Sequence, residues 1–195
     1  IGGGLGNLGA AEVAYSEAIA RSPNRWMAAY SRALTRLDQG NLDRAEADIA
    51  LAGRQFPDFV GLLYARGRVH LLRQRPTQAA AAFERYLSVR PRDANALFYA
   101  AFAANQLGNR EQALDYLDRM QAEEGASTRL LWLKAKTLMA AGRYGAADTL
   151  LRDAVAVEAP RPELIVLAQE ALMRQGRVDA ALALVQRALK ARPKS

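Results

Sequence analysis

The spacing of apolar residues along the chain repeats with a fixed period. An alanine, a larger apolar residue and a third apolar residue recur at positions i, i+4 and i+7, and successive copies are 34 residues apart. This spacing places one apolar stripe along an α-helix. The copies are Ala45/Ile49/Ala52, Ala79/Phe83/Tyr86, Ala113/Leu117/Met120, Ala147/Leu151/Ala154 and Ala181/Val185/Ala188.

A turn is predicted before each of these helices. Five residues before each alanine is a slot that holds glycine in all but one copy, and glycine readily adopts the left-handed backbone of a tight turn. The slots are Gly6, Gly40, Gln74, Gly108, Gly142 and Gly176. Because Gln74 replaces glycine and Pro76 follows it, we expect this turn to depart from the regular geometry. Small residues recur in the segment before each turn, at Ala33, Gly67, Ala101 and Ala135.

A fixed period in this range indicates stacked structural repeats. We expect an all-α, right-handed solenoid of 34-residue helix–turn–helix units with about eleven helices, antiparallel in pairs. Residues 1–25 would be the second helix of a repeat that lacks its first helix, which suggests a fragment of a longer repeat protein. The glycine-rich residues 1–8 predict a turn and a frayed end rather than helix. The full units are 26–59, 60–93, 94–127, 128–161 and 162–195.

These marks together resemble the tetratricopeptide repeat. The small residue of the first helix, the turn glycine and the alanine of the second helix all match, and closing prolines are present at Pro23, Pro57, Pro91 and Pro193. The resemblance implies a non-catalytic scaffold for protein–protein interaction, which holds a peptide or protein segment in a concave groove lined by the first helices. An alternative comes from a likeness to repeats of bacterial exopolysaccharide export and assembly proteins, which implies a polysaccharide-binding scaffold.

The resemblance also implies which residues line the groove. Aromatic residues and cations would form a ladder on the first helices, and both are common in binding hot spots. Arg68 and Lys136 would meet acidic groups of a protein partner, or the aromatic rings would stack on an anionic polysaccharide. Tyr30 and Tyr64 could equally serve to pack the repeats together. The expected groove residues are Tyr30, Tyr64, Arg68, Asn95, Phe98, Phe102, Asn105, Arg129, Trp132 and Lys136.

The charge distribution and the residue composition argue against nucleic-acid binding and metal binding. The net charge is +7, but it is banded: residues 60–93 hold seven arginines against two carboxylates, whereas residues 94–127 hold two arginines against five. We therefore rank nucleic-acid binding last, because the acidic band would repel a phosphate backbone. The chain has no cysteine and only one histidine, His70, so no metal site is expected.

No catalytic or cofactor site is expected either. The glycines at 4, 6 and 9 match a dinucleotide-binding spacing, but no strand precedes them. No apolar run is long enough to insert in a membrane. The sequence is compatible with either a cytoplasmic or a periplasmic location.

Overall fold

The computed structural model describes residues 3–22, 25–157 and 161–190, and this part of the chain contains eleven α-helices and no strand. The prediction of an all-α repeat fold is confirmed. The chain divides into two compact units, Ile1–Ala103 and Ala104–Ser195. The division falls inside the sixth helix.

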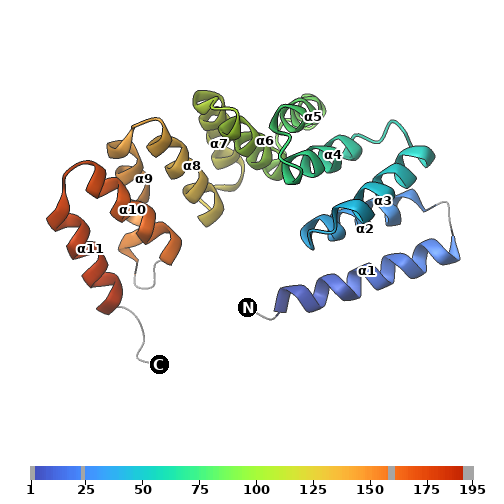
Figure 1. The fold of residues 1–195 in the computed structure, drawn as a ribbon, viewed down its shortest axis with the longest axis horizontal. Helices are drawn as coiled ribbons and strands as arrows, with labels where there is room; N and C mark the ends of the chain where they lie inside the picture. The colour runs from blue at the N-terminus through green and yellow to red at the C-terminus, as the bar shows by residue number, and fades with distance from the viewer. Residues whose placement is uncertain (1–2, 23–24, 158–160, 191–195) are drawn as a thin grey trace. The chain divides into compact units, whose positions relative to one another are not determined.

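Unit 1 is built from helices that pack in consecutive pairs (Figure 1). After α1, helix α2 lies against α3, and α4 lies against α5. Pro57 and Pro91 follow the ends of α3 and α5, as the repeat predicts, because proline cannot continue a helix. The bounds are α1 (Gly3–Arg21), α2 (Trp26–Asp38), α3 (Leu42–Gln55), α4 (Gly61–Leu72), α5 (Pro76–Val89) and α6 (Ala94–Gln106), whose last three residues belong to unit 2.

Unit 2 repeats the same arrangement. Helix α8 packs on α9, and α10 packs on α9 and α11. Pro162 is in the first turn of α10, where its missing N–H has no helical partner to lose. Pro23 and Pro193, predicted to close repeats, lie outside the described residues. The bounds are α7 (Arg110–Glu124), α8 (Thr128–Ala140), α9 (Tyr144–Ala156), α10 (Pro162–Arg174) and α11 (Val178–Lys190).

The turns between paired helices share one hydrogen-bonding pattern, and Gln74 follows it. At Gly40, φ is +76°, the Gly40 N–H bonds the Leu37 carbonyl, and the next N–H bonds the Arg36 carbonyl. This is the Schellman motif. Gln74 has φ +57°, its N–H bonds the Leu71 carbonyl at 3.0 Å, and the next N–H, of Arg75, bonds the His70 carbonyl at 2.8 Å. The expected departure at Gln74 is therefore wrong: the hydrogen bonds of the turn hold a non-glycine residue in the left-handed region.

The N-terminal helix also differs from expectation. Helix α1 begins at Gly3 and runs through Gly6, where a turn was predicted. Glycine permits a left-handed turn but does not impose one. The glycine slot marks a turn in this chain only between two helices that pack together.

The predicted apolar stripes form the cores of the units. In unit 1, Ala45, Ile49 and Ala52 are buried against the small Ala33 of the preceding helix. The space at Gly67 is filled by the Phe83 ring, since a Cβ at Gly67 would come within 2.7 Å of it. Small first-helix residues therefore let the paired helices approach closely.

A polar network joins the first three helices. The carboxylate of Asp48, on α3, is 4% exposed and accepts hydrogen bonds from Arg32 at 2.9 and 2.7 Å and from Arg36 at 2.8 Å. Arg36 also bonds Glu12 on α1 at 2.9 Å, and Arg32 bonds Ser16 at 3.0 Å. Arg32 is thus neutralised within unit 1.

Candidate functional site

The ten predicted groove residues all lie on first helices, and within each unit we call the surface that these helices present its first-helix face. Unit 1 holds six of them and unit 2 holds four. Unit 1 has Tyr30 on α2, Tyr64 and Arg68 on α4, and Asn95, Phe98 and Phe102 on α6; unit 2 has Asn105 on α6 and Arg129, Trp132 and Lys136 on α8.

In unit 1, Tyr64 is the centre of an aromatic cluster. Its ring centroid lies 6.1 Å from that of Phe83, 5.5 Å from that of Tyr86 and 6.0 Å from that of Tyr99. Phe83 also stacks on Tyr99, with an interplanar angle of 12°. The rings of α4, α5 and α6 thus pack on one another, which gives Tyr64 a structural role. Tyr99 was missed by the sequence reasoning; its only signal was its place beside Phe98.

The phenol groups of this region are held neutral. Burial, with a further contribution from the negative charge of Asp93, raises the pKa of Tyr30 to about 12. Burial also raises the pKa values of Tyr64 and Tyr86 well above their usual range. The Tyr86 hydroxyl donates to Asp93 Oδ2 at 2.7 Å. These tyrosines therefore offer no ionised oxygen for chemistry.

Tyr30 also packs inside unit 1. Its ring meets that of Phe59 edge-on, with centroids 4.8 Å apart, and Trp26 lies 4.7 Å from the same Phe59 ring. Edge-to-face pairs at such distances are favourable beyond the area they bury. Tyr30 and Tyr64 thus both make the packing contacts considered as the alternative to partner binding.

Arg68, predicted as a groove cation, is an internal residue of unit 1. It is 9% exposed, and its guanidinium donates to Asp38 Oδ1 at 2.6 Å. The same guanidinium lies over the Tyr99 ring, 5.2 Å from the centroid. Its charge is therefore balanced inside the unit. Of the other predicted residues in unit 1, Asn95 is exposed, and Phe98 and Phe102 are half-buried.

In unit 2, Trp132 and Lys136 form an accessible pair. They are one turn apart on α8, and the Lys136 ammonium is 4.7 Å from the centroid of the Trp132 ring. Trp132 is half-buried and Lys136 is exposed. A cation over an indole face is attracted by the ring quadrupole. Within the described residues, no ion pair is found for Lys136.

The other two predicted residues of unit 2 are bonded locally. Asn105 donates to the hydroxyl of Thr137 at 2.6 Å, and that hydroxyl donates to the Leu133 carbonyl at 2.7 Å. Thr137 is only 1% exposed, so this bond ties α6 to α8; the sequence reasoning did not single it out. Arg129 is exposed and pairs with Glu124 at 3.0 Å.

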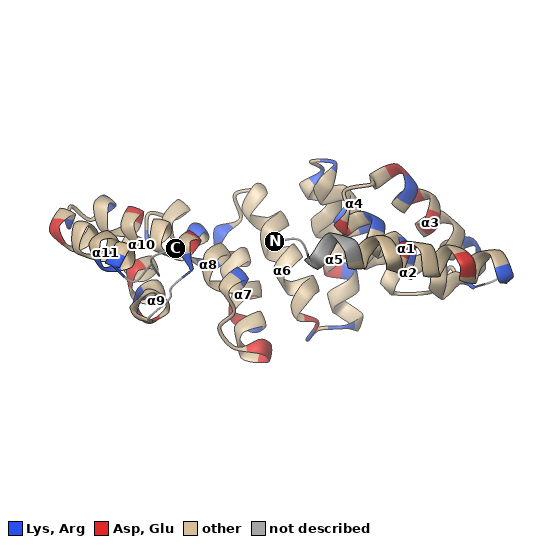
Figure 2. Cartoon of the chain, turned by 90° about the horizontal axis from the view of Figure 1, so that it is seen from below, with Lys and Arg blue, Asp and Glu red and all other residues tan. Residues whose placement is uncertain are grey.

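Charge on the described helices is unevenly distributed. Helix α6 carries no charged residue and is uncharged along its whole length in Figure 2. No group of histidine and carboxylate side chains among the described residues could hold a metal ion. None of the described helices is long and apolar enough to cross a membrane.

Helix pairs, left-handed turns and buried small residues at a 34-residue spacing define an all-α solenoid of helical repeats. Two tetratricopeptide-repeat models match the chain, one at residues 3–60 and 62–127 and the other at residues 138–195. The chain belongs to the tetratricopeptide repeat family. No curated protein sequence matches it.

Solved structures of tetratricopeptide proteins show the same fold. YrrB, described as having an unusual peptide-binding site, is 17% identical, with a TM-score of 0.69 and 93% of each chain covered. The type IV pilus biogenesis factor PilW is 22% identical, with a TM-score of 0.79, 88% of this chain covered and 80% of PilW. A tetratricopeptide protein from Parabacteroides merdae is 19% identical, with a TM-score of 0.67, and covers 97% of this chain and 74% of its own.

The family defines the class of function. Tetratricopeptide proteins bind protein or peptide partners, and their repeats are typically non-catalytic. The chain is thus a protein–protein interaction scaffold.

Proposed function

We propose that this scaffold binds an acidic peptide segment on its first-helix face, with Lys136 and Trp132 as the main contacts. The pair formed by these two side chains carries the proposal. An exposed cation next to a half-buried indole can receive a carboxylate and an apolar side chain from the same segment. Tryptophan is also among the residues most enriched in binding hot spots.

The contacts of Arg68 support this choice between the two predicted cations. Arg68 is already paired with Asp38 and covered, so recruiting it would break an internal ion pair. Lys136 requires no such exchange among the described residues. In unit 1, the exposed Asn95 and half-buried Phe98 and Phe102 are the candidates for further contacts on the same kind of face.

The position of Lys136 favours a peptide over a polysaccharide. Sugar rings stack on an open aromatic face, and one face of Trp132 is covered by the Lys136 ammonium. Polysaccharide binding is kept as an outcome of the test. The proposed function is binding, in keeping with the typically non-catalytic repeats of the family.

Fluorescence of Trp132 tests this proposal. Trp26 is the other tryptophan, so a Trp26→Phe background makes the signal specific. We would titrate this protein with a capped peptide containing glutamate and phenylalanine, and separately with oligogalacturonate as an acidic glycan. We expect the peptide to shift the emission, and Lys136→Glu to weaken its binding at least ~10-fold, which is about 1.4 kcal/mol.

Arg110→Glu provides the matched control. It makes the same charge change at an exposed site on α7, a second helix of the same unit. Equal losses for both variants would indicate diffuse charge attraction and contradict a site at Lys136. A response to the glycan but not to the peptide would favour the polysaccharide alternative.

A further inference from the structure

Two hollows in unit 2 occupy the same place in successive repeats, and Lys136 is not among the residues that line them. One is bordered by α7, α8 and α9 and has a volume of about 550 Å³; the other, bordered by α9, α10 and α11, has about 430 Å³. Four residues of the first hollow recur 34 positions later in the second, two leucines, one alanine and one arginine. They are Leu138/Leu172, Leu150/Leu184, Ala146/Ala180 and Arg143/Arg177.

The two hollows differ in how their charges are satisfied. In the first, Lys134 reaches across and pairs with Asp118 at 2.5 Å and with Gln121 at 2.7 Å. The residues at the same places in the second hollow are Ala168 and Arg152. The bridging cation is replaced by a methyl group and its acidic partner by a further cation.

The corresponding place in unit 1 is filled by ion pairs. There, Arg32, Arg36 and Asp48 form the buried network described above. Their equivalents 136 residues later are Ala168, Leu172 and Leu184. The hollow bordered by α9, α10 and α11 therefore has an apolar floor where residues 26–59 and 128–161 carry paired charges.

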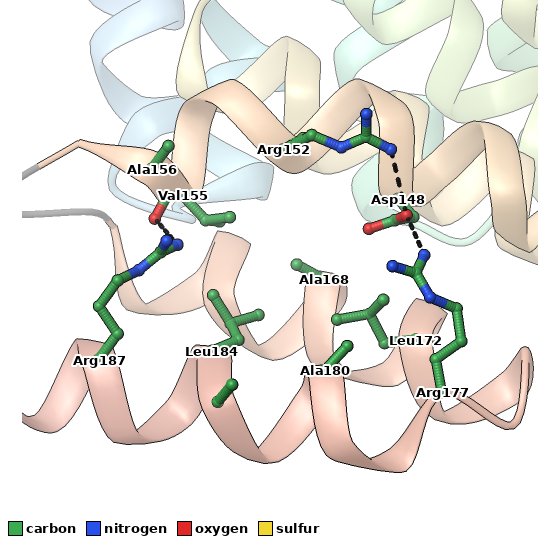
Figure 3. A pocket seen from close by; sticks show the side chains of 11 residues that line it. Asp148, Arg152, Val155, Ala156, Ala168, Leu172, Arg177, Ala180, Leu184 and Arg187 are labelled. Carbon is green, nitrogen blue, oxygen red and sulfur yellow. Dashed lines mark hydrogen bonds and ion pairs between the residues drawn. The ribbon is translucent and has the colours of Figure 1, made fainter.

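Arginines stand at both ends of this floor (Figure 3). At one end, Arg177 and Arg152 both point at Asp148, at 2.7 and 3.5 Å. At the other end, Arg187 donates to the Val155 carbonyl at 2.9 Å. The lining thus carries three guanidinium groups and a single carboxylate, and the side chains of Arg152 and Arg177 are 64% and 50% exposed.

We propose that this hollow is a second docking site, for a partner polypeptide segment in which an apolar side chain lies between acidic residues. The apolar side chain would cover Ala168, Leu172 and Leu184. The carboxylates would bind Arg152 at one end and Arg187 at the other. A guanidinium has five N–H donors, so Arg187 can bind a carboxylate through two of them and keep its bond to Val155.

The size of the hollow fits this occupant. Asp148 and Val155 are seven residues apart on α9, which is about 10 Å along a helix axis. An extended segment covers that distance in about three residues. Charge complementarity requires the acidic ends, because the lining carries two positive charges in excess.

Titration of the ¹⁵N-labelled chain with the capped peptide Glu-Leu-Leu-Glu, followed by NMR, tests the site. We expect shift changes at Arg152, Leu184 and Arg187. Arg152→Glu with Arg187→Glu should raise the Kd at least ~10-fold, and the paired glutamine variant should raise it less. Arg174→Glu, an exposed change on α10 outside the lining, should leave the Kd unchanged.

Two further peptides make the result specific. Lys-Leu-Leu-Lys should not bind, and Glu-Ser-Ser-Glu should bind several-fold more weakly because it lacks the apolar part. The proposal is overturned by equal affinity for the serine peptide, by an unchanged Kd in the doubly charge-reversed protein, or by shifts confined to Trp132 and Lys136. Sedimentation without peptide, if it shows dimers that the glutamate variant abolishes, would assign the hollow to a second copy of this chain and overturn the peptide proposal.

Discussion

The guanidinium of Arg68 donates a hydrogen bond to Asp38 at 2.6 Å and thereby joins α4 to the end of α2. A cation that the repeat pattern places in the binding groove thus serves to hold two consecutive repeats together. Its position over the Tyr99 ring extends the same contact to α6. The Arg68–Asp38 pair therefore helps to hold the helices of unit 1 together.

A double-mutant cycle on this pair should show measurable coupling. We expect Arg68→Met to lower the free energy of unfolding by about 2 kcal/mol, because a buried contact over Tyr99 is lost as well, and the coupling to Asp38→Asn to be about 1 kcal/mol. Urea denaturation measures both. The more exposed pair Arg73–Asp43, at 2.7 Å, should couple by less than about 0.5 kcal/mol. Equal coupling in both cycles would contradict a structural role for Arg68.

Gln74→Gly should stabilise the protein. A left-handed backbone costs a non-glycine residue about 1–2 kcal/mol, which glycine avoids. Part of this gain is offset, because glycine has more conformational freedom in the unfolded chain and loses it on folding. The net gain should be about 0.5–1 kcal/mol, seen as a higher Tm. Gly108→Ala, at φ +79°, makes the reverse change in an equivalent turn and should lower the Tm. A neutral or destabilising Gln74→Gly would mean that the glutamine side chain stabilises its turn.

Gly67→Ala should destabilise unit 1 by about 1–3 kcal/mol, because the new Cβ would lie 2.7 Å from the Phe83 ring. The control is Gly145→Ala on α9, where the nearest atom is 3.8 Å away. That change should stabilise by about 0.5–1 kcal/mol through helix propensity. Thermal unfolding followed by circular dichroism measures both. Adding Phe83→Leu should recover stability only in the Gly67→Ala protein, and its failure to do so would place the clash elsewhere.

Asp48→Asn should cost about 3 kcal/mol, because Arg32 and Arg36 would lose their shared carboxylate. Replacing all three residues with leucine should be far milder, within about 1–2 kcal/mol of the original, since residues 162–195 carry Ala168, Leu172 and Leu184 at these places. Denaturant midpoints compare the two proteins. A triple variant as unstable as Asp48→Asn would mean that the network gives net stability beyond mutual neutralisation.

Mild acid should weaken unit 1 through His70. Burial, followed by the positive charge of Arg75, holds the pKa of His70 below its usual 6.5. The unfolded chain therefore binds this proton more readily, so the contribution is fully present above pH 6.5 and is lost as pH falls through the lower folded pKa. Denaturant midpoints between pH 8 and 5 should fall in the original protein and stay flatter in His70→Gln.

Glu12 should act in a separate and more acidic range. The hydrogen bond that Arg36 donates to Glu12 lowers the pKa of Glu12 below 4.5, so the contribution of Glu12 to stability is lost only in stronger acid.

Identical pH profiles for the original protein and His70→Gln between pH 8 and 5 would contradict the role given to His70.

The sequence predicted the fold more fully than the site. Ala45, Ile49 and Ala52 follow the helical period, and period alone specifies which side of a helix is buried. The predicted irregularity at Gln74 was wrong, because the N–H groups of Gln74 and Arg75 still bond the carbonyls of the last turn of α4 and hold Gln74 in the left-handed region. The turn predicted at Gly6 is helix, because glycine permits a left-handed turn but does not impose one.

By itself the sequence determined the repeat, its length and the helices, because a periodic stripe and a turn slot require only neighbours along the chain. The tertiary structure alone decided which cations are accessible. Arg68 and Lys136 share a place in their repeats, but Arg68 meets Asp38 and Tyr99 while Lys136 stays exposed beside Trp132. Whether a charge is neutralised depends on side chains distant in sequence, Asp38 being 30 residues from Arg68, and only the folded packing brings them within hydrogen-bonding distance.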